Sequence, residues 1–103
     1  MYQLTALYSH PEDPTAFDKH YREVHSKLGA ALPGVKAFTM NWPAPGPDGG
    51  KPSYHFIATI YWDSAEECQA ALSGPEGEAA LADLPNFAGA GVDIMTGPAE
   101  VVV

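Results

Sequence analysis

The stretch 54-YHFIATIYW-62 decides the fold, because it is the clearest strand in the chain and carries no residue that is formally charged at pH 7. Successive side chains of a strand point to opposite faces, and an antiparallel sheet with one wet face alternates cleanly between apolar and polar residues. Here neither face is polar enough for bulk water, so we expect both faces of the sheet to be covered. One face would carry Tyr54, Phe56, Ala58, Ile60 and Trp62, and the other His55, Ile57, Thr59 and Tyr61.

Capping and turn residues separate the other elements on both sides of this strand. Asp13-Pro14 is typical of a helix start, since a capping carboxylate precedes a proline at the first helical position. Pro33-Gly34 ends that helix, and Gly74-Pro75 interrupts a later one. The pattern predicts strands at 2–8, 35–42, 54–62 and 92–96, helices at 14–31, 64–73 and 75–83, and a proline- and glycine-rich loop at 43–53.

The resulting order, β-α-β-β-α-β with a broken second helix, predicts an α+β fold of the ferredoxin-like type. Its four-stranded antiparallel sheet would have helices on one face, in a single domain over residues 1–103. A single helix layer covers only one side of a sheet. A homodimer that pairs the sheet faces is the simplest cover for the other side and would form a dimeric α+β barrel. A monomer with one damp face is the alternative.

Composition excludes several classes of partner. Five basic and 13 acidic residues give a formal net charge of −8, so the chain lacks the basic surface that nucleic acids and anionic membranes require. No apolar run approaches the roughly 18 residues of a membrane span. The lone Cys68 excludes an internal disulfide and is expected to be a small core residue. No signal peptide is recognised at the N-terminus, and we expect a cytoplasmic protein.

Histidines are the first candidates for chemistry. The four in the chain show no i,i+4 pair and no cysteine partners, so the usual zinc spacings are absent and no metal site is expected. His20 and His25 are five residues apart and are expected to point to different sides of the helix, with His20 on the outer face. His25 lies at the border of a predicted buried stripe, where it could act as acid or base, orient a ligand or ligate haem. The alternative is a partly buried imidazole bonded to a backbone carbonyl. The stripe consists of Phe17, Tyr21, Val24, Leu28 and Ala31 or Leu32.

The run 74–92, GPEGEAALADLPNFAGAGV, closely resembles the C-terminal signature of EthD-like proteins. Phe17, Tyr21 and His25 resemble the helix-one pattern of the same family, as does the turn 32–35. The resemblance implies a dimeric α+β barrel with a ligand cleft between sheet and helices. It maps His25 and Tyr21 onto positions that face this cleft, and Asp83, Asn86 and Phe87 onto the C-terminal signature. Alternatively, Asp83 and Asn86 cap the loop backbone while Phe87 fills the core.

The wider superfamily that this resemblance implies contains cofactor-free monooxygenases, polyketide cyclases, muconolactone-type isomerases and haem-degrading enzymes. We therefore expect a small, cofactor-independent enzyme that acts on a hydrophobic, aromatic or polyketide-like molecule. His25 would serve as acid/base or anchor and Tyr21 as hydrogen-bond donor. A non-catalytic binding or accessory protein for an apolar metabolite is the alternative, and haem handling through His25 is a third. The expected ligand contacts are Phe17, Tyr8, Phe56, Trp62, Asp83, Asn86 and Phe87.

Overall fold

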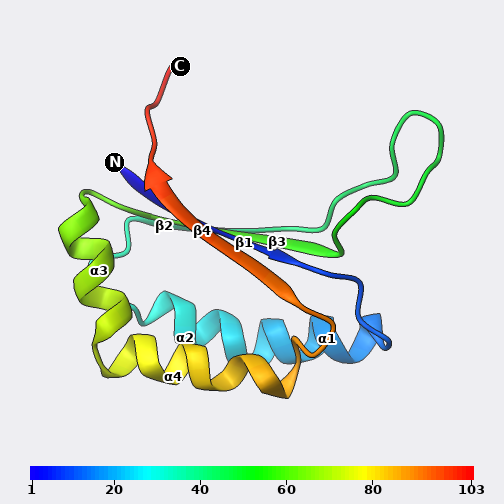
Figure 1. Cartoon of the computed structure of the whole chain (residues 1–103), viewed down its shortest axis with the longest axis horizontal. Helices are drawn as coiled ribbons and strands as arrows, with labels where there is room; N and C mark the ends of the chain where they lie inside the picture. Colours follow the sequence, from blue (N-terminus) through cyan, green and yellow to red (C-terminus); the bar gives the residue numbers. More distant parts are fainter.

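The computed structural model describes residues 1–103 and consists of one sheet with all its helices on one side (Figure 1). The strands lie in the order β2-β3-β1-β4, and every neighbouring pair is antiparallel. The predicted α+β, ferredoxin-like fold with a four-stranded antiparallel sheet is confirmed. The elements are β1 (Tyr2–Tyr8), α1 (Pro14–His20), the π-helical turn η1 (Tyr21–His25), α2 (Ser26–Ala30), β2 (Ala37–Asn41), β3 (Phe56–Trp62), α3 (Ala65–Ser73), α4 (Pro75–Asp83), the 3-10 turn η2 (Leu84–Asn86) and β4 (Val92–Pro98).

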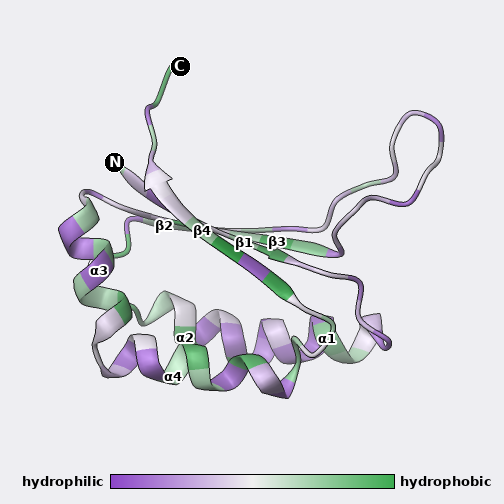
Figure 2. Cartoon of the chain, viewed as in Figure 1, coloured by the Kyte–Doolittle hydropathy of each residue, from purple (hydrophilic) through white to green (hydrophobic).

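The two central strands form the floor of the core. Residues of β1 pair with β3 from Tyr2 opposite Trp62 to Tyr8 opposite Phe56, so the residues that face the helices lie directly across from one another. The side chains on the other face of these strands are half-buried even though no helix covers them. The long connection between β2 and β3 extends away from the sheet and shows no strongly hydrophobic stretch (Figure 2). The buried residues of the two strands are Leu4, Ala6, Tyr8, Phe56, Ala58, Ile60 and Trp62.

The first helical segment begins as predicted but widens in its middle. The Asp13 carboxylate accepts a hydrogen bond from the Ala16 N–H at 3.0 Å and so caps α1. Further along, the N–H of Ser26 bonds the carbonyl of Tyr21, five residues back, which defines a π-helical turn. The regular helix predicted for 14–31 is therefore wrong between residues 21 and 25.

This wide turn changes which residues are buried. In a regular α-helix a residue four positions on is rotated by about 40° past a full turn. A stripe of buried residues therefore stays on one face only if three-residue steps alternate with four-residue steps. The π-helical turn absorbs this rotation, and the buried positions follow constant four-residue steps: Phe17, Tyr21, His25 and Gly29. Val24, predicted to face the core, is 41% exposed.

The second helical segment is broken at Gly74, as predicted, and each half is anchored differently. The Ser64 hydroxyl accepts from the Glu67 N–H at 3.2 Å and caps α3, which buries Cys68. At the start of α4, Gly77 lies so close to α3 that a Cβ there would be 2.1 Å from the Leu72 carbonyl oxygen. Ala79, predicted to face the core, is exposed, whereas the last residue of α4, Asp83, is buried.

None of the helices is long and apolar enough to cross a membrane.

Candidate functional site

A buried carboxylate joins the two helical segments. Asp83, at the end of α4, is 8% exposed, and its Oδ2 lies 2.9 Å from Nδ1 of His25 on η1. An ionised carboxylate can only accept, so the proton of this bond sits on Nδ1 of the imidazole. Nε2 of His25 has no hydrogen-bond partner within the protein. In the neutral ring, Nε2 therefore carries a free lone pair that can take up a proton.

His20 approaches the same carboxylate from α1. Its Nε2 is 3.0 Å from both carboxylate oxygens of Asp83, and Nδ2 of Asn86 donates to Oδ1 at 3.0 Å. The expectation that His20 and His25 point to different sides, with His20 on the outer face, is wrong. Residues five apart are rotated by about 140° in an α-helix. Through a π-helical turn, whose hydrogen bonds span five residues, they lie about one turn above each other on the same side.

Burial and hydrogen bonding pull the pKa values of this cluster in different directions. Burial is the largest effect on Asp83 and would raise its pKa, but hydrogen bonds from Asn86, His20 and His25 together outweigh it and hold the pKa below its usual range. Burial also dominates at His25, where it lowers the pKa of the imidazole despite the opposing hydrogen bond from Asp83. At neutral pH the carboxylate is therefore ionised and His25 is neutral, the states that a general base needs.

Two buried tyrosines form a row with His25, in which Tyr21 packs against His25 and Tyr8 packs against Tyr21. The ring of Tyr21 is 5.1 Å from that of His25 and 5.7 Å from that of Tyr8. Burial raises the pKa of Tyr8 to about 12 and raises the pKa of Tyr21 further. Both phenols thus keep their protons across the physiological pH range. The hydrogen bond between them raises the pKa of Tyr21 and opposes the rise at Tyr8, so Tyr21 donates to Tyr8 and the Tyr8 O–H is left for a ligand oxygen.

The cluster separates two hollows of different character. The inner one lies between helices and sheet, holds about 60 Å³, and has 13 hydrophobic residues among its 16 lining residues, with Tyr8, Tyr21 and His25 among them. Its volume is well below the roughly 300–1,000 Å³ of most ligand pockets, so the ligand-sized gap expected at this place is largely filled by side chains. Leu81 and Ile94, which also line it, are 52% and 45% exposed and form its solvent-facing side.

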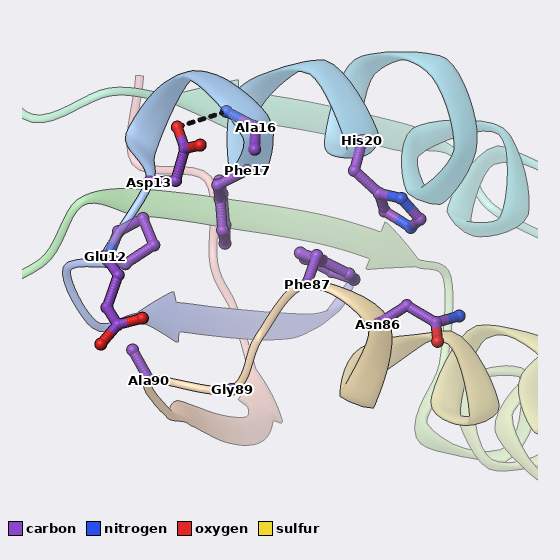
Figure 3. Close-up of a pocket in the computed structure, with 10 residues that line it drawn as sticks. Glu12, Asp13, Ala16, Phe17, His20, Asn86, Phe87, Gly89 and Ala90 are labelled. Atoms are coloured by element: carbon purple, nitrogen blue, oxygen red, sulfur yellow. Dashed lines mark hydrogen bonds between the residues drawn. The ribbon is translucent and has the colours of Figure 1, made fainter.

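The outer hollow is wider, at about 840 Å³, and opens near the start of α1. His20 and Asn86 lie at one end of it, Glu12 and Ala90 at the other, and Phe17 and Phe87 between them (Figure 3). Asp83 lines neither hollow but bonds His25 of the inner one and His20 of the outer one. The two hollows are thus connected through one carboxylate.

Most of the residues expected at the site come together here. His25, Tyr21 and Tyr8 line the inner hollow, while Phe17, Asn86 and Phe87 line the outer one. The Phe87 ring bridges them, at 4.7 Å from the His25 ring and 5.0 Å from the His20 ring. None of the hydrogen bonds of Asp83 and Asn86 side chains goes to the loop backbone, so these residues build the cluster and do not cap the loop.

Besides Asp83, two expected residues lie outside both hollows, namely Phe56 and Trp62. Phe56 packs against Tyr21 with ring centroids 4.3 Å apart and supports the site from beneath. Trp62 is fully buried farther along β3, where its Nε1 donates to the carbonyl of Pro33 at 2.9 Å. Sequence reasoning also missed His20. The signal that could have found it is the constant four-residue spacing of Phe17, Tyr21, His25 and Gly29, which a regular α-helix does not keep in line.

His55 and Cys68 lie outside the candidate site and contribute to the packing of the fold. His55 bonds Oδ1 of Asp18 at 2.8 Å, and Trp42 donates to the same oxygen at 3.0 Å, which ties the ends of the β2–β3 connection to α1. Cys68 is buried as expected, and it is this burial that raises the pKa of its thiol. Neither His55 nor Cys68 lines a hollow.

Comparison with known proteins agrees with this architecture. The model of the EthD domain matches residues 9–91, which include the whole cluster. The chain belongs to the EthD domain family. A relative in this family is an uncharacterized 11.0 kDa protein of the thcB–thcC intergenic region in Rhodococcus erythropolis, which is 40% identical over 100% of this chain and 99% of its own length.

Solved structures show the same EthD-like fold. An EthD family protein from Bacillus halodurans superimposes with a TM-score of 0.90 at 33% identity, over 97% of this chain and 99% of that one. A protein of unknown function from Thermobifida fusca, described as dimeric and ferredoxin-like, gives 0.69 at 20% identity, over 93% and 88%. A cofactor-independent oxygenase from Streptomyces nogalater gives 0.67 at 15% identity, over 99% and 94%. The likeness to the last two shows the fold alone.

Proposed function

We propose that this EthD-domain protein is a small, cofactor-independent enzyme that moves a proton on an apolar, aromatic or polyketide-like molecule. The observation that carries the proposal is the bond of 2.9 Å between His25 Nδ1 and the buried Asp83 carboxylate, which leaves Nε2 without a partner on a residue that lines the inner hollow. A carboxylate that fixes the tautomer and orientation of an imidazole is the arrangement by which enzymes make histidine a general base. His25 is the base in this proposal, and Asp83 is a positioning residue.

The tyrosines supply the second half of the reaction. When His25 removes a proton from an acidic C–H or O–H bond, the electron pair stays on the substrate and charge develops on a neighbouring oxygen. Tyr21 and Tyr8 have raised pKa values and remain protonated. Tyr21 donates to Tyr8, and the Tyr8 O–H can donate to that oxygen. Oxygenation, cyclisation and isomerisation of such molecules can all begin with this removal of a proton, which is the step assigned to His25.

The inner hollow is too small to admit a ring-shaped ligand unless side chains move. A ring does not fit into about 60 Å³, so a substrate reaches His25 by displacing side chains at the solvent-facing side, where Leu81 and Ile94 are half-exposed. A flat molecule that enters here would reach His25 Nε2 between the sheet and α4.

Deuterium exchange tests the proposal, because it detects removal of a proton whatever product is formed afterwards. The protein is incubated in heavy water with a panel of aryl ketones that carry α-hydrogens, 1,3-diketones and lactones, each of which has a C–H bond next to a carbonyl group, and deuterium uptake is followed by mass spectrometry. We expect accelerated exchange for at least one class, a loss of about 10²–10⁴-fold in His25→Gln, and a smaller loss in Tyr21→Phe. His10→Gln is the matched control, because His10 lines neither hollow.

The same panel separates the enzyme from a carrier. Ligands that raise the melting temperature but exchange no faster with the protein than in buffer would favour the non-catalytic alternative, a binding or accessory protein for an apolar metabolite. Exchange that is accelerated equally by the protein and by His25→Gln would contradict the role of His25.

We also propose that two copies pair through the uncovered sheet face. Leu7 and Ile57 are partners across β1 and β3 on this face, Thr5 and Thr59 form the next pair, and all four are half-buried. The neighbour from Thermobifida fusca, described as dimeric, supports this proposal. Light scattering is expected to give about twice the 10.9 kDa chain mass, and Leu7→Lys is expected to halve it. A wild-type mass of one chain at micromolar concentration would refute the pairing.

A further inference from the structure

One carboxylate, that of Asp83, bonds a histidine of each hollow, so the charges of these two histidines are coupled. Oδ2 of Asp83 receives Nδ1 of His25 at 2.9 Å and Nε2 of His20 at 3.0 Å. Both imidazoles thus depend on one negative charge. No lysine or arginine lines either hollow, so no other cation from the walls balances this carboxylate.

We infer that His20 is a positioning residue that shares one positive charge with His25, and that it releases its proton into the outer hollow when His25 takes one from the substrate. One imidazolium beside the ionised Asp83 makes a neutral cluster. A second imidazolium would place two like charges against one buried carboxylate, which is costly because they repel each other. The inference rests on the proposed function for the role of His25 as the base.

The surroundings of His20 suit the shared charge better than those of His25 do. His20 is more exposed than His25, with 27% against 9% of the side chain accessible, so hydration stabilises its charged form better. Glu12 and Asp13 line the same outer hollow, and their carboxylates also favour a positive charge on that side. The groups that face His25 from β1 and η1 are the phenols of Tyr8 and Tyr21, which are neutral and offer no such help.

The proton balance of one turnover follows. The substrate C–H or O–H bond breaks, its electron pair stays on the substrate, and the proton binds Nε2 of His25. His20 then loses the proton on Nδ1 to water in the outer hollow and keeps Nε2–H as a donor to Asp83. The charge of the cluster is unchanged. The inner hollow can therefore stay closed over its substrate while a proton leaves through the outer one.

Proton–nitrogen NMR of the uniformly labelled protein tests this without any substrate. In the wild-type protein we expect the His25 ring to titrate over a wider pH range than a single site, because its protonation opposes that of His20. In His20→Gln the amide can still donate to Asp83 but carries no charge. We expect the His25 titration to become that of a single site and to shift to higher pH. In His20→Phe, which keeps a ring against Phe87, the shift is expected in the same direction.

A purely structural role of His20 predicts a different result. Loss of the bond to Asp83 would then loosen the carboxylate and destabilise His20→Phe, with no upward shift of the His25 titration in His20→Gln. That outcome would overturn the inference, as would a His25 titration that is the same in all three proteins. Neither outcome touches the proposed function, which fails separately if His25→Gln retains full deuterium exchange. His10→Gln serves as the control in both experiments.

Discussion

Replacement of Asp83 by asparagine tests how the carboxylate sets the tautomer of His25. The wild-type carboxylate accepts from three side chains, His25 at 2.9 Å and His20 and Asn86 at 3.0 Å. An amide has the same shape but only one acceptor oxygen. If this oxygen keeps His20 and Asn86, the NH₂ group faces Nδ1 of His25. The imidazole must then move its proton to Nε2 in order to accept a hydrogen bond.

The energetic cost follows from the number of bonds. A hydrogen bond to a charged group stabilises by about 1 kcal/mol more than a neutral one, so three partners of Asp83 give about 3 kcal/mol. The variant also escapes the cost of burying a carboxylate, which offsets part of the loss and leaves about 1–2 kcal/mol. In a domain of this size such a loss lowers the melting temperature by about 5–15 °C. Because Nε2 now carries a proton, deuterium exchange on a responsive substrate should fall by about 10²–10⁴-fold.

Two measurements check this reasoning, namely urea unfolding for the free energy and proton–nitrogen NMR for the tautomer of His25. Asn86→Ala is the matched control, because it removes one hydrogen bond of Asp83 and leaves the carboxylate in place. We expect it to cost about 1 kcal/mol and to leave the proton of His25 on Nδ1. An Asp83→Asn protein in which His25 still carries its proton on Nδ1 would refute the proposed link between the carboxylate and the tautomer.

Stability should fall on acidification in two stages. Burial lowers the pKa of His25 in the folded protein, so the unfolded chain binds a proton more readily. Stability therefore declines as the pH falls below 6.5, the ordinary pKa of histidine. In pH-dependent urea unfolding, His25→Gln should lack this first stage. The pKa of Asp83 is also lowered, so its contribution is present above 3.8 and is lost as the pH falls below that value, a stage that Asp83→Asn should lack. Gly77→Ala should destabilise by more than about 2 kcal/mol, because its Cβ would overlap the Leu72 carbonyl at 2.1 Å. Gly89→Ala, where no atom lies within 4 Å of the added carbon, should be nearly neutral by thermal unfolding.

The sheet was predictable from the sequence because strand side chains alternate with a fixed period of two. The apolar residues on both faces of 54–62 predicted a strand, and β3 lies there between β1 and β2. Helix starts are marked by Asp13 and Ser64, whose side chains form the capping bonds. The last strand extends to Pro98, two residues past its predicted end, because β1 pairs with it along its full length. Such an extension depends on a partner strand, which a local pattern does not contain.

The site was predictable only in part, because its decisive contacts join residues far apart in the chain. His25 was recognised from its place at the border of an apolar stripe, and the resemblance to EthD-like proteins added Tyr21. That Asp83 rather than Ala79 faces inward depends on how α4 packs after the break at Gly74, where Gly77 touches the Leu72 carbonyl of α3. A carboxylate at the end of an alanine-rich helix is more often exposed, so hydropathy alone argues against its burial.

The π-helical turn explains why both histidines matter to the same carboxylate. A turn of this kind is rare and is found mostly at functional sites, since its wider hydrogen-bond spacing packs the backbone less well than an α-helix. Here it brings His20 and His25 to Asp83 from one segment, and it keeps Phe17 and Tyr21 in line with them against the sheet. A regular helix with the same residues would turn one imidazole away from the carboxylate and leave a buried acceptor short of a donor. The local cost of the wide turn is thus offset by the hydrogen bonds of Asp83. The position of His25, the candidate base, depends as much on this turn of the first helical segment as on the Asp83 carboxylate that the second segment supplies.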